Sequence, residues 1–110
     1  MKIIRNNVIP FKGFAAINLF GVLFVRKDAR VTERMLNHES IHTAQMKETL
    51  YVFFYVWYFT EWVIRLFMKG NAYRNISFER EAYANQDDRM YLADREPMAW
   101  TGYLKERRGT

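Results

Sequence analysis

The chain of 110 residues contains no cysteine, only two prolines and only two histidines. The absence of cysteine excludes a disulfide scaffold, a thiol nucleophile and any cysteine-ligated zinc or iron–sulfur site. Internal repeats and low-complexity tracts are also absent, and the length suits a single domain over residues 1–110. Half of the residues are hydrophobic and 17% are aromatic, so the chain has enough apolar surface to bury a core.

The excess of basic charge lies near the N-terminus. Residues 1–30 hold six basic side chains and one acidic side chain, whereas residues 31–110 hold eleven of each sign. A basic N-terminal segment can meet an anionic membrane surface or nucleic acid, although solvated surface charges are the commoner case. No nucleic-acid-binding motif accompanies it, so we expect no nucleic-acid partner. Pro10, Lys12 and Gly13 interrupt the first apolar run, which argues against a signal peptide and favours a cytoplasmic protein, with membrane association left open.

The residues before Arg26 predict a small β-sheet or hairpin. Residues 14–25 are rich in Ile, Leu, Val and Phe, with Gly13 and Gly21 as breakers. This composition favours one bent strand or a tight strand pair over a helix. Thr32 then provides a suitable N-cap for a helix that we expect to continue to about residue 49.

The segment from Tyr51 to Met68 has the most unusual composition, with eight aromatic residues among positions 51–62. Its length approaches that of a membrane span, but Glu61 and Arg65 lie within it, and a bilayer penalises ionised groups at depth. Spaced i,i+4, the two charges can pair on one helix face. We therefore expect a mostly buried or membrane-surface helix, with a true span and a partner-binding face as alternatives.

A third helix is expected further along the chain. Asn75 or Ser77 can cap it, and the pattern continues to about Asp94 before Pro97 stops it. The sequence therefore predicts an α+β, mainly helical domain, with a small N-terminal sheet followed by three or more helices.

The two histidines lie in the motif His38-Glu39-Ser40-Ile41-His42, an HExxH motif in the middle of the first predicted helix. One helical turn separates the imidazoles, so both can reach one Zn²⁺ at roughly 2.0–2.1 Å. Glu39 is turned by about 100° from His38, so it flanks the metal and can act as catalytic base toward bound water. The alternative is an ordinary helix that carries a His-Glu-His trio on its surface.

Zinc needs at least one more protein ligand, and without cysteine or a third histidine this ligand should be a carboxylate. Glu79 and Glu81 lie in the third predicted helix. On a helical wheel Glu79 falls in an apolar sector with Phe78, Ala82 and Tyr83, where a carboxylate needs a partner. Glu81 falls on a mostly polar side of the helix. We expect it either to be solvated or to support one of the metal ligands. The wheel favours Glu79 as the third ligand and leaves Glu81 as the alternative.

An HExxH motif followed by a Glu-x-Glu-Ala helix resembles the gluzincin zinc metallopeptidases. The likeness covers residues 15–92 and is strongest to the soluble minigluzincins and to the catalytic cores of related integral-membrane peptidases. In those peptidases the carboxylate ligand is the first residue of a Glu-x-x-Ala-Asp signature. Aligned on this signature, Glu79 is the ligand. Tyr83 then stands where the family has an Asp that supports a zinc-bound histidine. In the thermolysin-like signature, Glu-Ala-x-x-Asp, Glu81 would be the ligand and Asn85 would replace the Asp. In either register the supporting acid is missing.

The resemblance implies zinc-dependent hydrolysis of a peptide or protein substrate, with Zn²⁺ held by His38, His42 and Glu79 and with Glu39 as the base. In that family an edge strand upstream of the metal-binding helix aligns the substrate, and residues 16–24 are similar in position. The candidates for supporting a ligand or stabilising an oxyanion are Tyr73, Tyr83 and Asn85. The alternative function is a catalytically inactive zinc-binding protein with a structural role, or with a membrane-surface role through residues 51–68 and the basic N-terminal segment.

Overall fold

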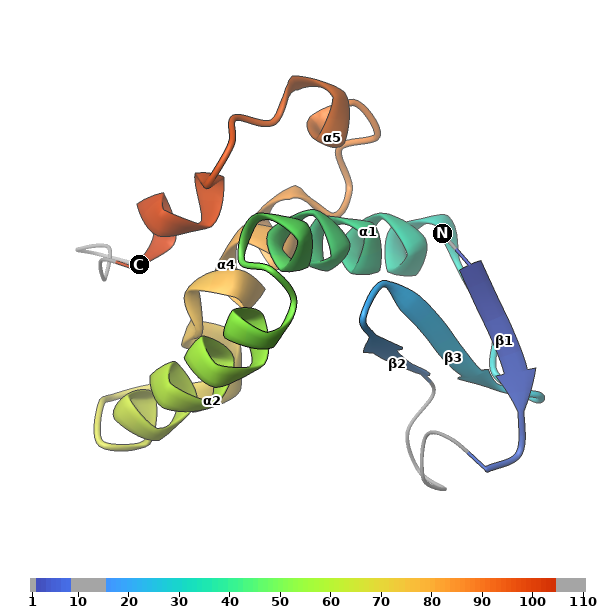
Figure 1. The fold of residues 1–110 in the computed structure, drawn as a ribbon, viewed down its shortest axis with the longest axis horizontal. Helices are drawn as coiled ribbons and strands as arrows, with labels where there is room; N and C mark the ends of the chain where they lie inside the picture. The colour runs from blue at the N-terminus through green and yellow to red at the C-terminus, as the bar shows by residue number, and fades with distance from the viewer. Residues whose placement is uncertain (1, 9–15, 105–110) are drawn as a thin grey trace.

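The computed structural model describes residues 2–8 and 16–104, and it has the α+β, mainly helical fold that the sequence predicts (Figure 1). Pro10, Lys12 and Gly13, which interrupt the first apolar run of the sequence, lie outside these ranges. The strands are β1 (Lys2–Asn6), β2 (Ala16–Leu19) and β3 (Val22–Arg26). The helices are α1 (Glu33–Glu48), α2 (Val52–Leu66), α3 (Ala72–Asn75), α4 (Ser77–Asn85), α5 (Tyr91–Asp94) and the 3₁₀ helix η1 (Ala99–Tyr103).

The three strands form one sheet in the order β1-β3-β2. β2 and β3 are antiparallel, with Asn18 opposite Leu23, which confirms the predicted strand pair. β1 lies parallel to the other side of β3, with Ile3 opposite Leu23. Gly21 in the connecting turn has a φ of +88°, a left-handed conformation that glycine adopts without steric cost. Among the described strands, β2 is therefore an edge strand.

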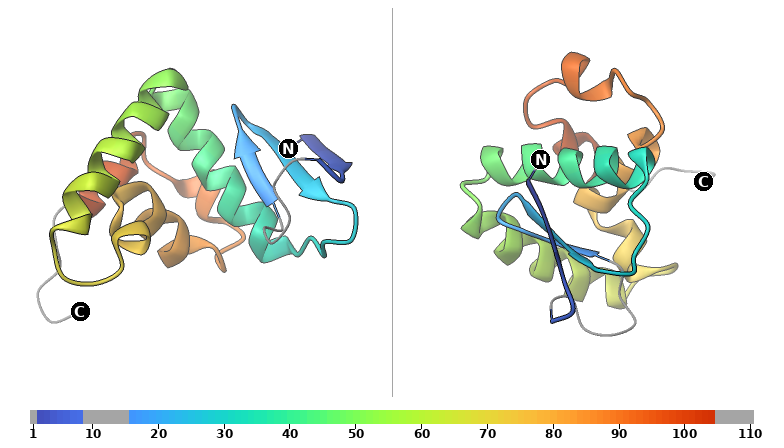
Figure 2. Two further views of the ribbon diagram at one scale, coloured as in Figure 1. Left: turned by 90° about the horizontal axis from the view of Figure 1, so that it is seen from below. Right: turned by 90° about the vertical axis from the view of Figure 1, so that its right-hand side faces the viewer.

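Helix α1 lies between the sheet on one side and α2 and α4 on the other (Figures 1 and 2). It begins at the predicted cap, where the Thr32 hydroxyl accepts a hydrogen bond from the Met35 N–H at 3.1 Å. Its buried residues recur at the spacing of one helical face. They are His38, Ile41, His42, Gln45 and Met46. Both motif histidines are therefore buried within the domain.

The main hydrophobic cluster joins α1, α2, α4 and η1. Its buried members are Met46, Phe54, Ile76, Phe78 and Trp100. The Phe78 ring lies 4.4 Å from the Phe54 ring and 4.6 Å from the Trp100 ring, measured between centroids. This packing anchors the first turn of α4, and with it the neighbouring Glu79.

The aromatic segment forms the predicted helix, α2, and of the two forms expected for it, mostly buried or at a membrane surface, the mostly buried one is not observed. Only Phe54, Glu61 and Arg65 are buried in α2. The predicted ion pair is present, with an oxygen of Glu61 3.1 Å from a nitrogen of Arg65. The described part of the domain packs against one stripe of α2 only, so much of the helix remains exposed. Among the described helices, none combines the length and the hydropathy that a transmembrane span requires.

The start of the third predicted helix differs from the expectation. Asn71 is the residue that caps, because its side chain accepts the Arg74 N–H at 3.1 Å at the beginning of α3. Asn75 is the last residue of α3, and Ser77 is the first residue of α4. The Ser77 hydroxyl donates to Glu61 at 2.6 Å instead of capping a helix. The buried ion pair of α2 thus holds the start of α4.

The helix expected to continue to Asp94 also ends early. α4 stops at Asn85, and a residue distant in sequence binds the carbonyls of the turn that follows. The Asn37 amide on α1 donates to the backbone carbonyls of Asn85, Gln86 and Asp88 at 2.8–3.3 Å. The carbonyls of Asn85 and Asp88 also accept the backbone N–H groups of Asp88 and Tyr91, each at 3.1 Å, so Asn37 adds a second partner to both. The turn after α4 is therefore tied to α1.

Candidate metal centre

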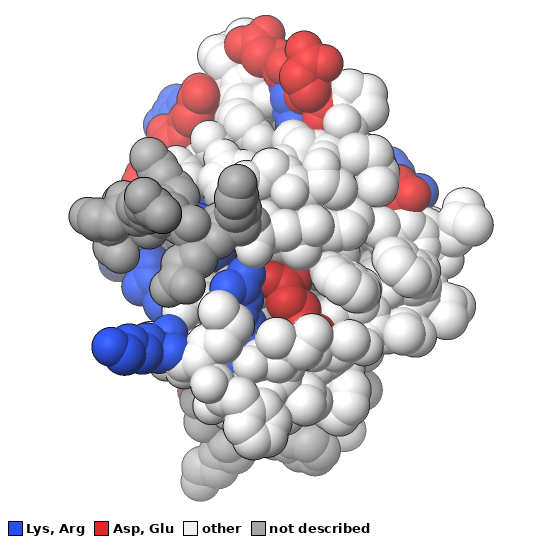
Figure 3. All heavy atoms as spheres, turned by 90° about the vertical axis from the view of Figure 1, so that its left-hand side faces the viewer, with Lys and Arg blue, Asp and Glu red and all other residues white. Residues whose placement is uncertain are grey.

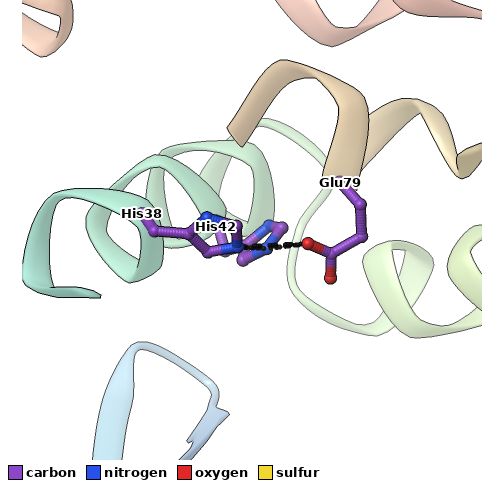
Figure 4. A group of neighbouring side chains, drawn as sticks. All are labelled: His38, His42 and Glu79. Atoms are coloured by element: carbon purple, nitrogen blue, oxygen red, sulfur yellow. Dashed lines mark hydrogen bonds and ion pairs between the residues drawn. The ribbon is translucent and has the colours of Figure 1, made fainter. Parts of the chain in front are cut away.

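Three side chains from α1 and α4 converge in the interior (Figure 4). An oxygen of Glu79 lies 3.1 Å from Nε2 of His38 and 3.0 Å from Nε2 of His42. The two Nε2 atoms are 3.2 Å apart. All three residues are buried, and the group could hold a metal ion.

The spacing of these three atoms fits a small tetrahedral ion. Ligand atoms about 2.05 Å from a tetrahedral zinc ion are separated by about 3.3 Å, and the observed separations are 3.0–3.2 Å. Two imidazole nitrogens and one carboxylate oxygen are also a ligand set that zinc uses in catalytic sites. Geometry and chemistry of the donor set are therefore both compatible with zinc.

Gln45 fixes the orientation and the tautomer of His42. The Gln45 amide nitrogen donates to the backbone carbonyl of Phe78 at 3.0 Å and to Glu81 at 2.9 Å. Its oxygen therefore faces Nδ1 of His42, at 2.8 Å, and can only accept there. A neutral His42 must then carry its proton on Nδ1, so the lone pair of Nε2 points into the cluster.

The Gln86 side chain contacts the other histidine, His38. Its side-chain oxygen lies 2.9 Å from Nδ1 of His38. Gln86 follows the end of α4, where the Asn37 amide binds its backbone carbonyl at 2.8 Å. The early end of α4 thus turns Gln86 onto a histidine of the cluster. The supporting acid is missing, as the sequence predicts, and the amides of two glutamines face the imidazoles instead. Neither glutamine was among the candidates predicted from the sequence.

The two residues that stand in place of the family's Asp have other contacts. The Tyr83 ring packs edge-on against the His38 ring, with centroids 4.6 Å apart. The Asn85 amide donates to the backbone carbonyl of Glu81 at 2.8 Å and to the Tyr103 hydroxyl at 3.2 Å. Neither side chain takes the hydrogen-bonding role of that acid.

The cluster favours a cation at its centre, because three electron-pair acceptors otherwise face one another. In the metal-free protein a proton can fill this role. Burial alone would lower the pKa of His42, but the Glu79 carboxylate outweighs this effect and raises the pKa to about 9. Burial alone would raise the pKa of Glu79, but the charge of His42 and hydrogen bonds from both histidines hold it far below its usual range. The site is thus suited to a buried cation, a proton or a metal ion.

Tyr58 on α2 binds the second oxygen of Glu79. Its hydroxyl donates to that oxygen at 2.6 Å. Burial and the Glu79 carboxylate raise the pKa of Tyr58 well above its usual range, so the hydroxyl keeps its proton. This bond leaves the other oxygen of Glu79 directed at the histidines.

A cavity of about 280 Å³ lies beside the cluster. Strand β2 forms one wall, and residues of α1 and α2 form others. Glu39, His42, Tyr73 and Glu79 all line it. The Glu39 side chain is half-buried, and its carboxylate makes no hydrogen bond to any residue of the described ranges. Glu39 is therefore a free carboxylate on the cavity side of the cluster.

Glu81 lies outside the cluster and is buried, so the solvated position suggested by the helical wheel is wrong. Its carboxylate pairs with Arg95, accepts a hydrogen bond from the Tyr91 hydroxyl and binds the Gln45 amide. Arg95 also pairs with Glu48 at 2.9 Å. Burial alone would raise the pKa of Glu81, but the hydrogen bonds from Arg95, Tyr91 and Gln45 lower it. Its partners follow α4 in sequence, and a wheel of that helix cannot show them.

Comparison of the chain with protein-family models, with curated proteins and with solved structures found no match. The geometry and chemistry of this site are therefore the basis for assigning a function.

Proposed function

We propose that this protein is a zinc-dependent peptidase of a minimal gluzincin type. The observation that supports this most strongly is the buried convergence of His38, His42 and Glu79 beside a cavity that Glu39 also lines. Two glutamine amides direct the Nε2 lone pairs of the histidines toward one point. A catalytic zinc site uses three protein ligands of this kind and keeps a further position open for water or substrate.

His38, His42 and Glu79 would hold the zinc, which when bound would supply a Lewis acid that polarises a peptide carbonyl and acidifies water. Glu39 would accept the proton of the attacking water and return it to the leaving amine. Tyr73 lines the same cavity, and burial with the nearby Glu79 carboxylate raises its pKa above the usual range. Its hydroxyl would therefore remain a donor toward a developing oxyanion.

Strand β2 would align the substrate. It lies at the edge of the sheet and forms one wall of the cavity, and an exposed strand edge can pair with an extended peptide. Asn18 ties this strand to α1, because its amide donates to the Glu39 backbone carbonyl at 3.0 Å and to the Thr43 hydroxyl at 3.2 Å. The register of a bound peptide would therefore be fixed relative to Glu39.

The alternative is a zinc-binding protein whose metal only joins α1 to α4. The neutral amides beside the histidines favour it, because a carboxylate in that place would make the imidazoles more basic. The Glu39 carboxylate argues against it, since a structural site does not need a free carboxylate in a neighbouring cavity.

The test begins with the metal content of protein purified without added metal, using His42→Ala as the control. We expect about one zinc per chain, and loss of it in the control. Wild type and Glu39→Gln are then compared on a broad peptide library. Glu39→Gln should keep the metal and lose hydrolysis by a factor of at least about 100. A wild type that binds zinc tightly but cleaves nothing would replace the peptidase with the structural zinc protein.

A further inference from the structure

The outward side of α2 presents a continuous apolar surface. Its large hydrophobic residues are 49–67% exposed. We call the following residues the α2 outer face: Val52, Phe53, Val56, Phe59, Ile64 and Leu66. With Leu50 and Phe67 at its ends, it exposes about 900 Å², taking side-chain areas of roughly 150–200 Å². Monomeric proteins rarely expose apolar patches of this size unless the patch has a partner.

The α2 outer face contains no charged group. Both charged residues of the helix, Glu61 and Arg65, pair on the buried side. The polar residue on the exposed side is Thr60, and its hydroxyl donates to the backbone carbonyl of Val56 at 2.7 Å. The face therefore offers almost no hydrogen-bonding capacity to a partner.

The charges that bracket α2 are basic. Lys47 precedes the helix, Lys69 and Arg74 follow it, and residues 62–78 include no acidic residue. The acid nearest the start of the helix, Glu48, is held in an ion pair within the domain. Figure 3 shows the side of the molecule on which α2 lies in Figure 1. Uncharged atoms cover most of this side, Lys and Arg gather toward one edge, and Asp and Glu appear at the top and near the centre. Basic residues at both ends of an uncharged helix face complement an anionic surface.

The chemistry of the face favours lipid over a protein partner. A protein interface contains about one hydrogen bond per 100–200 Å², and this face could supply few of them, whereas acyl chains require none. The 15 residues of α2 extend about 22 Å, which is shorter than the hydrocarbon core of about 30 Å. One side of the helix also packs against the rest of the domain. The helix can therefore lie flat in a membrane interface but cannot cross it.

We propose that α2 docks this protein on an anionic lipid membrane. Its outer face would enter the boundary between headgroups and acyl chains, while Lys47 and Lys69 would contact the headgroups. Tyr55 and Tyr58, on the inner side of the same helix, line the cavity. Docking would therefore hold the cavity about one helix diameter, roughly 10 Å, from the lipid surface. Docking itself does not depend on metal binding or on hydrolysis.

Co-sedimentation with vesicles tests the proposal. Wild type should bind vesicles of equimolar phosphatidylcholine and phosphatidylglycerol, and bind pure phosphatidylcholine much more weakly. Removing one inserted aromatic ring should weaken binding about tenfold, so Phe53→Ser combined with Phe59→Ser should weaken it about 100-fold. Met90→Ser is the matched control, because Met90 is 61% exposed and lies outside α2, and it should bind like wild type. Circular dichroism establishes that each variant is folded.

Charge reversal provides a second arm. Lys69→Glu should weaken binding to the anionic vesicles, whereas Arg89→Glu, at an exposed position away from α2, should change it little. The proposal is overturned if wild type does not bind the anionic vesicles, or if the double variant binds them as tightly as wild type. Self-association that the Phe variants abolish, without vesicle binding, would assign the face to a second copy of the chain. Zinc content of the same samples keeps this outcome separate from that of the peptidase proposal.

Discussion

The metal-free protein should become less stable as the pH rises from about 6.5 to about 9. His42 titrates near 6.5 in the unfolded chain, whereas in the folded protein the Glu79 carboxylate raises its pKa to about 9. A pKa raised on folding contributes stability that is complete below the unfolded value and is lost as the pH passes the folded value. One pKa unit corresponds to about 1.4 kcal/mol, so the expected loss is about 3 kcal/mol. His42 is buried, and solvent screening should reduce this effect little.

Bound zinc should remove this pH dependence of stability. The metal would take the place of the proton between His42 and Glu79, so its apparent affinity should rise with pH through the same interval. Bound zinc stabilises the folded state according to its free concentration relative to its dissociation constant. The difference in unfolding free energy between zinc-loaded and chelated protein should therefore be larger at pH 9 than at pH 6.5.

Urea unfolding of chelated and zinc-loaded protein at pH 6.5 and pH 9 measures both effects. Glu79→Gln is the control, because it removes the charge that raises the His42 pKa, and its chelated form should show little pH dependence in this interval. The reasoning is refuted if chelated wild type is equally stable at both pH values. It is also refuted if Glu79→Gln shows the same dependence as wild type.

Three substitutions separate the roles of the carboxylates and amides around the cluster. Glu79→Gln should weaken zinc binding by orders of magnitude, because it removes one of three protein ligands. Glu81→Gln should keep zinc but unfold more easily, since the buried Arg95 loses a charged partner. If Glu81→Gln loses zinc and Glu79→Gln keeps it, Glu81 is the ligand. Gln45→Ala should weaken zinc binding about 10- to 100-fold in competition with a chelator, because His42 loses the acceptor for its Nδ1 proton; unchanged affinity would contradict this role.

The sequence contains the local signals for much of this fold. Thr32 is a capping residue at the start of α1, and the helical spacing of the two histidines predicts one shared face, which the structure confirms. The apolar position of Glu79 on the helical wheel anticipates its burial, because a carboxylate in such a sector needs a partner. Signals of this kind depend on residues within one or two helical turns.

The features that could not be predicted depend on distant contacts. No proline or glycine lies between Asn85 and Asp94, where the helix was expected to end. In the structure the carbonyls after α4 instead bind Asn37 on another helix. The composition of α2 likewise predicts an apolar helix, but it does not predict which side of that helix packs against the rest of the domain. Gln45 lies three residues after His42 on one helix, so its contact with that histidine was accessible from helical geometry, whereas the Gln86 contact was not.

The hydrogen bonds around His42 connect the candidate metal centre to the chain beyond α4. Gln45 can orient this histidine only while Glu81 and the Phe78 carbonyl hold its amide nitrogen. Glu81 in turn keeps a negative charge in the interior because Arg95 neutralises it. The amide at Gln45 therefore gives the imidazole a fixed acceptor without placing a second negative charge beside Glu81, where two buried carboxylates would repel each other. An acid in place of Gln45 would introduce that repulsion, so a neutral amide at this position is consistent with the buried charges that this chain already holds.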